Sequence, residues 1–347
     1  MNRDNFTISL DAMGGDNCPV NEIKAAVDAL GLIDNLRIKL NGPADLLNRE
    51  LKNYSYDTAR LNVNDSKDVI RMDEVPTEAL KLKPDSSIAN GLRLVKNGEA
   101  DAFISAGNTG AVMAASLLIL GRIVNVSRPS IGSVFPTENG ITFLLDVGAN
   151  VDCKPMHLLE FGVMGSVYVN HIYGIDKPTV GLLSVGEEKS KGNQLTGEAY
   201  ELLEKSGLNF VGNVEGRDIL KGNTNVIICD GFTGNIILKF AESVPGILKA
   251  KFSAFANRNI LNKLKVASAY GTLRTIMKDF DYQEYGGVPL LGVNGISVIG
   301  HGRSTPKAFV TMIRKAMQMY NSNLIKAIES KIKDIKEFYN YSGYEKN

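Results

Sequence analysis

Apolar residues recur along this chain with two different spacings. Short runs rich in Val, Ile and Leu alternate with longer stretches in which apolar residues return every three or four positions. The short runs predict β-strands and the longer stretches predict amphipathic helices. The predicted strands are 7–10, 36–40, 60–63, 102–105, 142–145, 179–184, 210–211, 226–229 and 297–299. The predicted helices are 20–30, 44–51, 87–96, 110–123, 156–172, 193–205, 234–256 and 305–333.

This alternation predicts βαβ units, and hence an α/β fold with a mainly parallel, Rossmann-like sheet that carries helices on both faces. No stretch rich in Pro and Ser separates two halves of the chain. We therefore expect a single α/β unit over 1–347, with any second domain packed closely on the first. The composition, 44% hydrophobic and 22% charged, is ordinary for a globular protein with a sizeable core.

Gly-rich loops stand at several junctions between a predicted strand and the next helix. They are 10–16 (LDAMGGD), 105–110 (SAGNTG), 146–150 (DVGAN), 184–188 (SVGEE) and 230–235 (DGFTGN). Ligands of open α/β sheets bind at the carboxyl ends of the strands, so we expect these loops to line one cleft. Glycine lets backbone N–H groups approach a ligand, and a helix N-terminus attracts anions. The loops 106–110 and 232–235 are the best candidates for phosphate binding, although glycines can also serve only to make tight turns.

The chain lacks the sequence motifs of several common types of binding site and enzyme. The chain has no GxxxxGK[ST], no strand-borne GxGxxG and no GxSxG, which argues against a P-loop, a dinucleotide site and a serine acyl-enzyme. The cysteines Cys18, Cys153 and Cys229 form no CxxC, and with only three histidines a structural zinc site is not expected. Cys229 is interpreted as a buried, inert residue rather than a nucleophile.

Compartment and partners follow from charge and from cysteine usage. An odd number of cysteines, without the pattern of a signal peptide, predicts the reducing cytoplasm. The net charge of +1 provides no field that would attract nucleic acid.

Two polar segments are candidates for direct chemistry. The loop 187–193 (EEKSKGN) has two interpretations. Either the Lys191 amine reaches a phosphate or a developing oxyanion, or the loop is only a solvated turn. His301 stands between two glycines after the last predicted strand. It either contacts a phosphate or thioester or has a structural role.

The motifs at these loops resemble a known family. They are 11–16 (DAMGGD), 105–111 (SAGNTGA), 145–154 (LDVGANVDCK), 186–192 (GEEKSKG), 213–218 (NVEGRD), 229–235 (CDGFTGN) and 285–295 (YGGVPLLGVNG). In this order they are similar to the bacterial phosphate acyltransferases of phospholipid synthesis, the PlsX type. The resemblance extends from about residue 6 to about residue 335.

The resemblance implies a reaction, a fold and an assembly. Fatty acyl-[acyl carrier protein] and inorganic phosphate would give acyl phosphate and free carrier protein, and acyl phosphate would feed glycerol-3-phosphate acylation. The implied fold is akin to isopropylmalate dehydrogenase and phosphotransacetylase, and the implied assembly is a homodimer. Attack of a phosphate oxygen on a thioester carbonyl requires positioning and oxyanion stabilisation, but neither a metal nor a cofactor.

The motif matches also imply roles for individual residues. Lys191 and Asn235 would carry catalysis by hydrogen bonding to phosphate and oxyanion, and Asp230 would order its loop. The residues assigned to phosphate or substrate binding are Asp11, Gly14, Gly15, Asp16, Gly107, Asn108, Thr109, Gly110, Asp146, Asn150, Glu187, Asp230, Gly234 and His301.

A basic amphipathic region lies between the motifs 229–235 and 285–295. Between Ser243 and Lys278 the chain has seven basic residues and no acidic one, interleaved with large apolar side chains. This pattern predicts a helical hairpin joined near 256–260, within a possible subdomain at about 236–285. The segment 249–278 is expected to make peripheral contact with an anionic membrane. The alternatives are a grip on the acidic carrier protein, or an apolar face that belongs to the core or to a dimer interface.

Three other functions remain open. A phosphotransacetylase-like enzyme would use the same cleft with a short acyl-CoA as donor. An isopropylmalate-type dehydrogenase would need a metal-binding aspartate set and a nicotinamide site, and the sequence offers no clear pattern for either. A non-enzymatic scaffold that holds carrier protein at the membrane would not need the polar loops 186–193 and 230–235.

Overall fold

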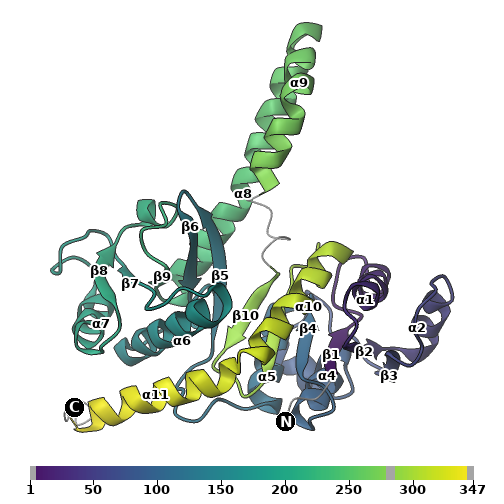
Figure 1. The fold of residues 1–347 in the computed structure, drawn as a ribbon, viewed down its shortest axis with the longest axis horizontal. Coiled ribbons are helices and arrows are strands. Elements are labelled where there is room, and N and C mark those ends of the chain that lie inside the picture. The colour runs from purple at the N-terminus through teal and green to yellow at the C-terminus, as the bar shows by residue number, and fades with distance from the viewer. Residues whose placement is uncertain (1–4, 279–285, 342–347) are drawn as a thin grey trace.

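A computed structural model describes residues 5–278 and 286–341 of the protein. Its strands form one sheet in the order β3-β2-β1-β4-β11-β10-β5-β6-β9-β7-β8. Figure 1 shows the two halves of this sheet as two lobes, with β10 between them. The strands are β1 (Phe6–Asp11), β2 (Leu36–Gly42), β3 (Leu61–Asp65), β4 (Ala102–Ser105), β5 (Ser130–Thr137), β6 (Gly140–Leu145), β7 (Val180–Leu183), β8 (Phe210–Val214), β9 (Val226–Ile228), β10 (Val288–Leu291) and β11 (Ile296–Ile299).

The sheet is parallel within each half and antiparallel where the halves meet. The strands β3, β2, β1, β4 and β11 are mutually parallel, and so are β6, β9, β7 and β8. Between them, β10 pairs antiparallel with both β11 and β5, and β5 pairs antiparallel with β6. The prediction of a mainly parallel α/β sheet is thereby confirmed.

The two strands that the sequence pattern missed are the antiparallel ones, β5 and β10. Each contains residues that usually interrupt a strand: Gly132 and Pro136 in β5, and Pro289 in β10. Gly132 is required by packing, because a Cβ there would stand 2.5 Å from Cδ1 of Leu145 and would overlap the ring of Phe143. Contacts with residues distant in sequence therefore explain why β5 contains a residue that usually interrupts a strand.

Helices cover both faces of the sheet, as predicted. They are α1 (Val20–Leu32), α2 (Ala44–Leu51), α3 (Pro76–Leu82), α4 (Ser87–Lys96), α5 (Thr109–Ile119), α6 (Pro155–Tyr173), α7 (Gln194–Lys205), α8 (Gly231–Ala256), α9 (Ile260–Lys278), α10 (Pro306–Asn321) and α11 (Leu324–Tyr341).

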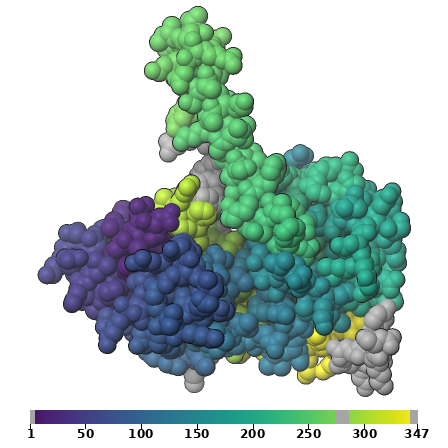
Figure 2. Space-filling model, turned by 180° about the vertical axis from the view of Figure 1, so that it is seen from behind, coloured from purple at the N-terminus to yellow at the C-terminus, as the bar shows by residue number. Residues whose placement is uncertain are grey.

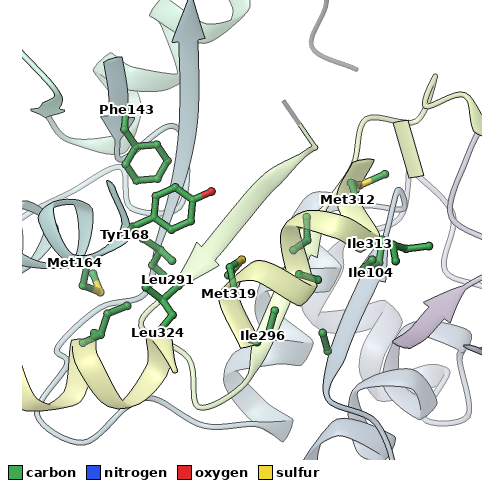
Figure 3. Close-up of a cluster of buried hydrophobic side chains, with 14 of the residues drawn as sticks. Ile104, Phe143, Met164, Tyr168, Leu291, Ile296, Met312, Ile313, Met319 and Leu324 are labelled. Atoms are coloured by element: carbon green, nitrogen blue, oxygen red, sulfur yellow. The ribbon is translucent and has the colours of Figure 1, made fainter. Parts of the chain in front are cut away.

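Successive strand residues point to opposite faces, and the apolar core divides accordingly. In β4, Ala102 and Ile104 belong to the cluster under α1, α2, α6, α7, α10 and α11, whereas Phe103 belongs to the cluster under α3, α4 and α5. Figure 3 shows part of the first cluster, in which Ile104 lies near Ile313 of α10. The second cluster also receives Ile237, Leu238 and Ala241 of α8.

The helix predicted over 305–333 is wrong, because two helices occupy this stretch. α10 ends at Asn321 and α11 begins at Leu324. Asn323 between them has φ of 51°, a left-handed conformation that a continuous helix does not allow. The predicted helix 110–123 ends early, at Ile119, and Gly121 follows with φ of 77°. The short helix α3 was not predicted.

The helical hairpin predicted for this basic region is confirmed, because α8 ends at Ala256 and α9 begins at Ile260. The two helices pack against each other, and the hairpin projects from the rest of the molecule in Figures 1 and 2. The part of the predicted subdomain at 279–285 lies outside the described residues. None of the helices in the described part of the chain has the length and apolarity needed to cross a membrane.

Candidate functional site

The loops that follow β1 and β4 touch each other. Asp11, buried at the end of β1, accepts hydrogen bonds from the Ser105 hydroxyl at 2.6 Å and from the Met13 backbone N–H at 3.0 Å. Burial raises the pKa of Asp11, while these hydrogen bonds act in the opposite direction. A Cβ on Gly14 would stand 2.5 Å from the backbone nitrogen of Gly107, so glycine is what allows the two loops to meet.

The loop after β11 joins this group. The backbone N–H of Asp16 donates to the carbonyl oxygen of Gly302 at 2.7 Å. A Cβ on Gly302 would lie 2.5 Å from Oδ1 of Asp16. His301 itself is exposed, and its Nδ1 accepts from the backbone N–H of Arg303 at 3.1 Å. The predicted residues Asp11, Gly14, Gly15, Asp16, Gly107 and His301 therefore share one cluster of loops.

The side chain of Asn108 is engaged by the protein itself. Its Oδ1 accepts from the Ala111 backbone N–H at 3.1 Å and so caps α5, while its Nδ2 faces the carbonyl oxygens of Arg71, Met72 and Glu74 at 3.0–3.2 Å. Thr109 beside it is exposed, and Gly110 packs against Pro76. The side chain of Asn108 thus shapes the start of α5, and Thr109 is the predicted residue whose side chain is accessible there.

Asp146 organises the loop after β6. Its carboxylate is fully buried and accepts hydrogen bonds at 2.7–3.2 Å from the N–H groups of Ile131, Gly148, Ala149 and Asn150 and from the Asn150 amide. Burial raises the pKa of Asp146, and these hydrogen bonds offset part of that effect. Because its carboxylate accepts from so many donors of the surrounding backbone, Asp146 fixes the shape of the loop.

The start of α8 is built directly on this loop. The backbone N–H of Gly231 donates to the carbonyl oxygen of Asn150 at 2.7 Å. Asp230 caps the helix by accepting from the backbone N–H and the hydroxyl of Thr233, each at 2.8 Å. A Cβ on Gly234 would overlap the carbonyl oxygen of Asp146, so only glycine lets the helix approach this closely.

Asn235 therefore has a defined place. Its side chain is exposed and lies over the backbone of Gly148, since a Cβ on that glycine would stand 3.5 Å from Asn235 Cγ. It stands one residue after the contact between Gly234 and Asp146. The position of its amide is set by the loop after β6 and by the cap of α8.

The loop after β7 carries Lys191 on its surface. The Lys191 backbone N–H donates to the Glu188 carbonyl oxygen at 2.9 Å, and the same oxygen accepts from the Asn213 amide at 2.9 Å. The neighbouring Lys189 pairs with Glu204 at 2.7 Å. In the described parts of the chain, the exposed Lys191 amine makes no hydrogen bond or ion pair. Glu187 is also exposed and meets Arg217 at 3.4 Å.

The predicted site residues form two groups. The loops after β6, β9 and β7 are neighbours because their strands are adjacent and parallel, with Leu145 and Leu182 both in register with Ile228. The loops after β1, β4 and β11 belong to the other half of the sheet. No hydrogen bond between described residues joins the two groups, so a single cleft stays a prediction. Both groups border the same face, because Ala111 at the start of α5 and Cys229 before α8 share one apolar cluster.

Some residues around these loops were not predicted. The Ser105 hydroxyl donates to Asp11 and accepts from the Gly107 N–H, and the Asn213 amide donates to the Glu188 carbonyl oxygen. Glu22 is buried beneath the Gly14–Asp16 turn. Glu22 gives no sequence signal, because a glutamate in the first turn of a helix is ordinarily an exposed, favourable charge. Within 5–278 and 286–341, no group of three or more His, Cys, Asp or Glu is placed to hold a metal ion.

Comparison with known proteins agrees with the motifs. A family model described as "Fatty acid synthesis protein" matches residues 6–327. The phosphate acyltransferase of Halothermothrix orenii is 46% identical over 327 residues, which cover 94% of this chain and 98% of that protein. The phosphate acyltransferase of Pelotomaculum thermopropionicum is 48% identical over 328 residues, with 94% and 95% covered.

Solved structures support the fold. The EutD phosphotransacetylase from Staphylococcus aureus superposes with a TM-score of 0.58 at 17% identity, covering 93% of this chain and 94% of that one. A branched-chain phosphotransacylase from Enterococcus faecalis gives a TM-score of 0.57 at 16% identity, with 91% and 99% covered. At such identities the likeness shows a phosphotransacetylase-like fold, whereas the extent and identity of the sequence matches show that this chain belongs to the phosphate acyltransferase family.

Proposed function

We propose that the protein transfers a fatty acyl group from the thioester of acyl-[acyl carrier protein] to inorganic phosphate. A phosphate oxygen attacks the thioester carbonyl carbon, the carbon–sulfur bond breaks, and the thiolate takes the proton that hydrogen phosphate releases. The products are acyl phosphate and free carrier protein. One observation carries this proposal: two exposed nitrogen donors, the Lys191 amine on the loop after β7 and the Asn235 amide near the start of α8, follow the ends of the adjacent strands β7 and β9.

The two donors have complementary tasks in this proposal. Lys191 attracts the phosphate anion and hydrogen-bonds one of its oxygens, and Asn235 donates to the oxyanion that forms on the acyl carbonyl. A preorganised donor to an oxyanion is worth about 2.7–4 kcal/mol of transition-state stabilisation. The Asp230 cap and the contact between Gly234 and Asp146 hold Asn235 in place, so little reorganisation is needed during the reaction.

The remaining predicted residues would bind phosphate or hold the loops in shape. At the start of α5, the Thr109 hydroxyl and the backbone N–H of Gly110 would contact phosphate, because a helix N-terminus offers unpaired N–H groups. The N–H of Gly107 already donates to the Ser105 hydroxyl at 3.0 Å, so Gly107 would shape the loop. Asp11, Asp146, Asn150 and Asp230 hold their loops. The position of α5 and α8 over one apolar cluster supports a common cleft for donor and acceptor.

The donor and the acceptor can be tested together. Purified protein is incubated with palmitoyl-[acyl carrier protein], with and without inorganic phosphate, and free carrier thiol and acyl phosphate are quantified. Phosphate-dependent release of both products is expected. Turnover of acetyl-CoA with no turnover of the carrier-bound substrate would instead favour the phosphotransacetylase-like alternative. No turnover of either substrate, with binding of carrier protein retained in Lys191→Ala, would favour a scaffold.

We further propose a cytoplasmic protein that makes peripheral contact with anionic membranes through 249–278. Lys249, Lys251, Lys263 and Lys265 are exposed on the projecting hairpin, beside apolar side chains such as Leu261, which is 66% exposed. Such a surface buries apolar groups in the interface while the lysines meet anionic headgroups.

Vesicle flotation tests this contact. The double variant Lys263→Glu and Lys265→Glu should lose binding to vesicles that contain anionic lipid, whereas the matched exposed control Lys326→Glu on α11 should float like the parent protein. Equal flotation of the parent with neutral and anionic vesicles would contradict the role of the lysines.

A homodimer is the assembly that we propose, with α8 at the interface. Along one side of this helix Ile236, Phe240 and Ile247 are 54%, 72% and 54% exposed, which is unusual for large apolar side chains in a lone subunit. Analytical ultracentrifugation should find two copies for the parent and a shift toward monomer for Phe240→Asp. A monomeric parent would contradict the proposal.

A further inference from the structure

The carboxyl group of Glu22 is buried at the junction of two loops that carry proposed site residues. It lies in the first turn of α1 and is 0% exposed. Its Oε1 accepts the backbone N–H of Gly15 at 3.0 Å. Its Oε2 is also buried, and it has no hydrogen-bond partner among the residues that the structure describes. A buried carboxyl oxygen without a hydrogen-bond partner lowers the stability of the folded protein.

The turn above Glu22 is in contact with the loop after β11. The Asp16 backbone N–H donates to the Gly302 carbonyl oxygen at 2.7 Å, and a Cβ on Gly15 would lie 3.5 Å from the same oxygen. The amide of Asn21, next to Glu22 in sequence, donates to the Ser304 carbonyl oxygen at 3.0 Å. A change at the Glu22 carboxyl group therefore reaches both loops through direct contacts.

We propose that Glu22 is a positioning residue whose carboxyl group fixes the Gly14–Asp16 turn against the Gly302 loop and thereby sets the affinity of these loops for phosphate. This inference rests on the proposed function. Glu22 does not itself contact phosphate, because it is buried beneath the turn. Its effect passes through the backbone N–H of Gly15.

The charge of Glu22 makes this role dependent on pH. Burial, helped by the nearby Asp11 carboxylate, raises the pKa of Glu22 to about 8, although hydrogen bonds from its own backbone N–H and from the Gly15 N–H act in the opposite direction. Burial, together with the charges of Glu22, Asp11 and Asp16, raises the pKa of the nearby Cys18 to about 11. Of the elements packed against this turn and α1, the loop after β11 carries His301 and Arg303, and α10 carries Lys307 in its first turn.

In this proposal, the protein binds phosphate well when the Glu22 carboxyl group is neutral. Ionisation places an uncompensated negative charge beneath a turn proposed to bind an anion, and it favours opening of the turn toward water. At pH 9, one unit above a pKa of about 8, only about a tenth of the molecules keep Glu22 neutral. If only these bind phosphate well, the apparent KM for phosphate rises about tenfold between pH 7 and pH 9.

Steady-state kinetics tests this role of Glu22. The KM for phosphate is measured with palmitoyl-[acyl carrier protein] at pH 7 and pH 9, for the parent, Glu22→Gln and Glu22→Ala. Glutamine keeps an acceptor for the Gly15 N–H but cannot ionise, so its KM for phosphate should match the parent at pH 7 and stay level at pH 9. Alanine removes the acceptor, so its KM should be raised at both pH values with a smaller change in kcat. Ionisation of phosphate itself affects all three proteins alike and cancels in the comparison.

The outcomes separate this inference from the proposed function. A parent that turns over at pH 7 but shares its pH dependence of KM with Glu22→Gln overturns the role of Glu22. An Ala variant with the parental KM does the same. A parent without phosphate-dependent turnover at pH 7 contradicts the proposed function instead. Thermal unfolding gives a readout without activity: the parent should lose stability relative to Glu22→Gln as pH rises from 4.5 toward 8, and a constant difference would overturn the inference.

Discussion

The contact between Gly234 and Asp146 offers a sharp test of how the fold places Asn235. An added Cβ on Gly234 would overlap the Asp146 carbonyl oxygen and stand 2.9 Å from its carbonyl carbon and 3.0 Å from the Cys229 sulfur. Carbon atoms in contact normally lie about 3.5–4.0 Å apart. In Gly234→Ala, the first turn of α8 or the Asp146 loop must therefore move by about 1 Å.

Both stability and activity should respond to this movement. Overpacking of this kind typically costs about 1–3 kcal/mol, part of which is offset by the greater helix propensity of alanine, worth about 1 kcal/mol. Because Asn235 follows directly, its amide is displaced by a similar distance. A misplacement of about 1 Å can lower turnover about a hundredfold.

The matched control is Gly197→Ala in α7, where an added Cβ has open space around it. This variant should gain about 0.5–1 kcal/mol of stability and keep the parental turnover. The assay is phosphate-dependent release of carrier thiol, with urea unfolding of each variant and circular dichroism to establish folding. A folded Gly234→Ala variant with parental turnover would show that the close approach of α8 to Asp146 does not position Asn235.

Three other predictions follow from single side chains. Lys191→Ala and Asn235→Ala should each lower kcat by about 10²–10³-fold with a nearly unchanged melting temperature, since both side chains are exposed; parental turnover in either would remove that residue from the mechanism. Asp230→Ala should cost about 1 kcal/mol in urea unfolding by removing the cap of α8, and an unchanged midpoint would contradict the capping role. Burial lowers the pKa of Lys315 to about 8, so its charging costs stability that is restored as pH rises from 8 toward 10.5. The free energy of unfolding of Lys315→Met should therefore exceed that of the parent by about 1–2 kcal/mol at pH 7, once loss of the 3.0 Å hydrogen bond to Tyr173 is included, and by less at pH 9. A difference independent of pH would show that the charge of Lys315 is not its cause.

The sequence pattern predicted most of the parallel sheet and its helices, because these elements are specified locally. Strands such as β4 and β9 are short apolar runs between turn residues, and α1 and α4 show helical spacing. Where prediction failed, distant contacts or a single residue decided the outcome. β5 tolerates Gly132 because the Phe143 ring fills its place, and one left-handed asparagine divides the C-terminal helix.

The candidate loops were also visible in the sequence, but the division of labour within them was not. Motif positions such as Asn108 and Asp146 have side chains that the protein itself satisfies, whereas Thr109, Lys191 and Asn235 remain exposed. Local sequence does not show which polar group finds a partner far away along the chain. Glu22 illustrates this limit, since its burial depends on the turn at Gly15 and on the loop at Gly302.

The most direct test of the central claim asks whether phosphate is the acyl acceptor. The protein is incubated with palmitoyl-[acyl carrier protein] and phosphate labelled with heavy oxygen, and the products are identified by mass spectrometry. Attack by phosphate predicts acyl phosphate that retains all the heavy oxygen of the phosphate, in an amount equal to the free carrier thiol. Release of unlabelled fatty acid, with no labelled acyl phosphate, would show that water is the acceptor and would contradict the proposed reaction.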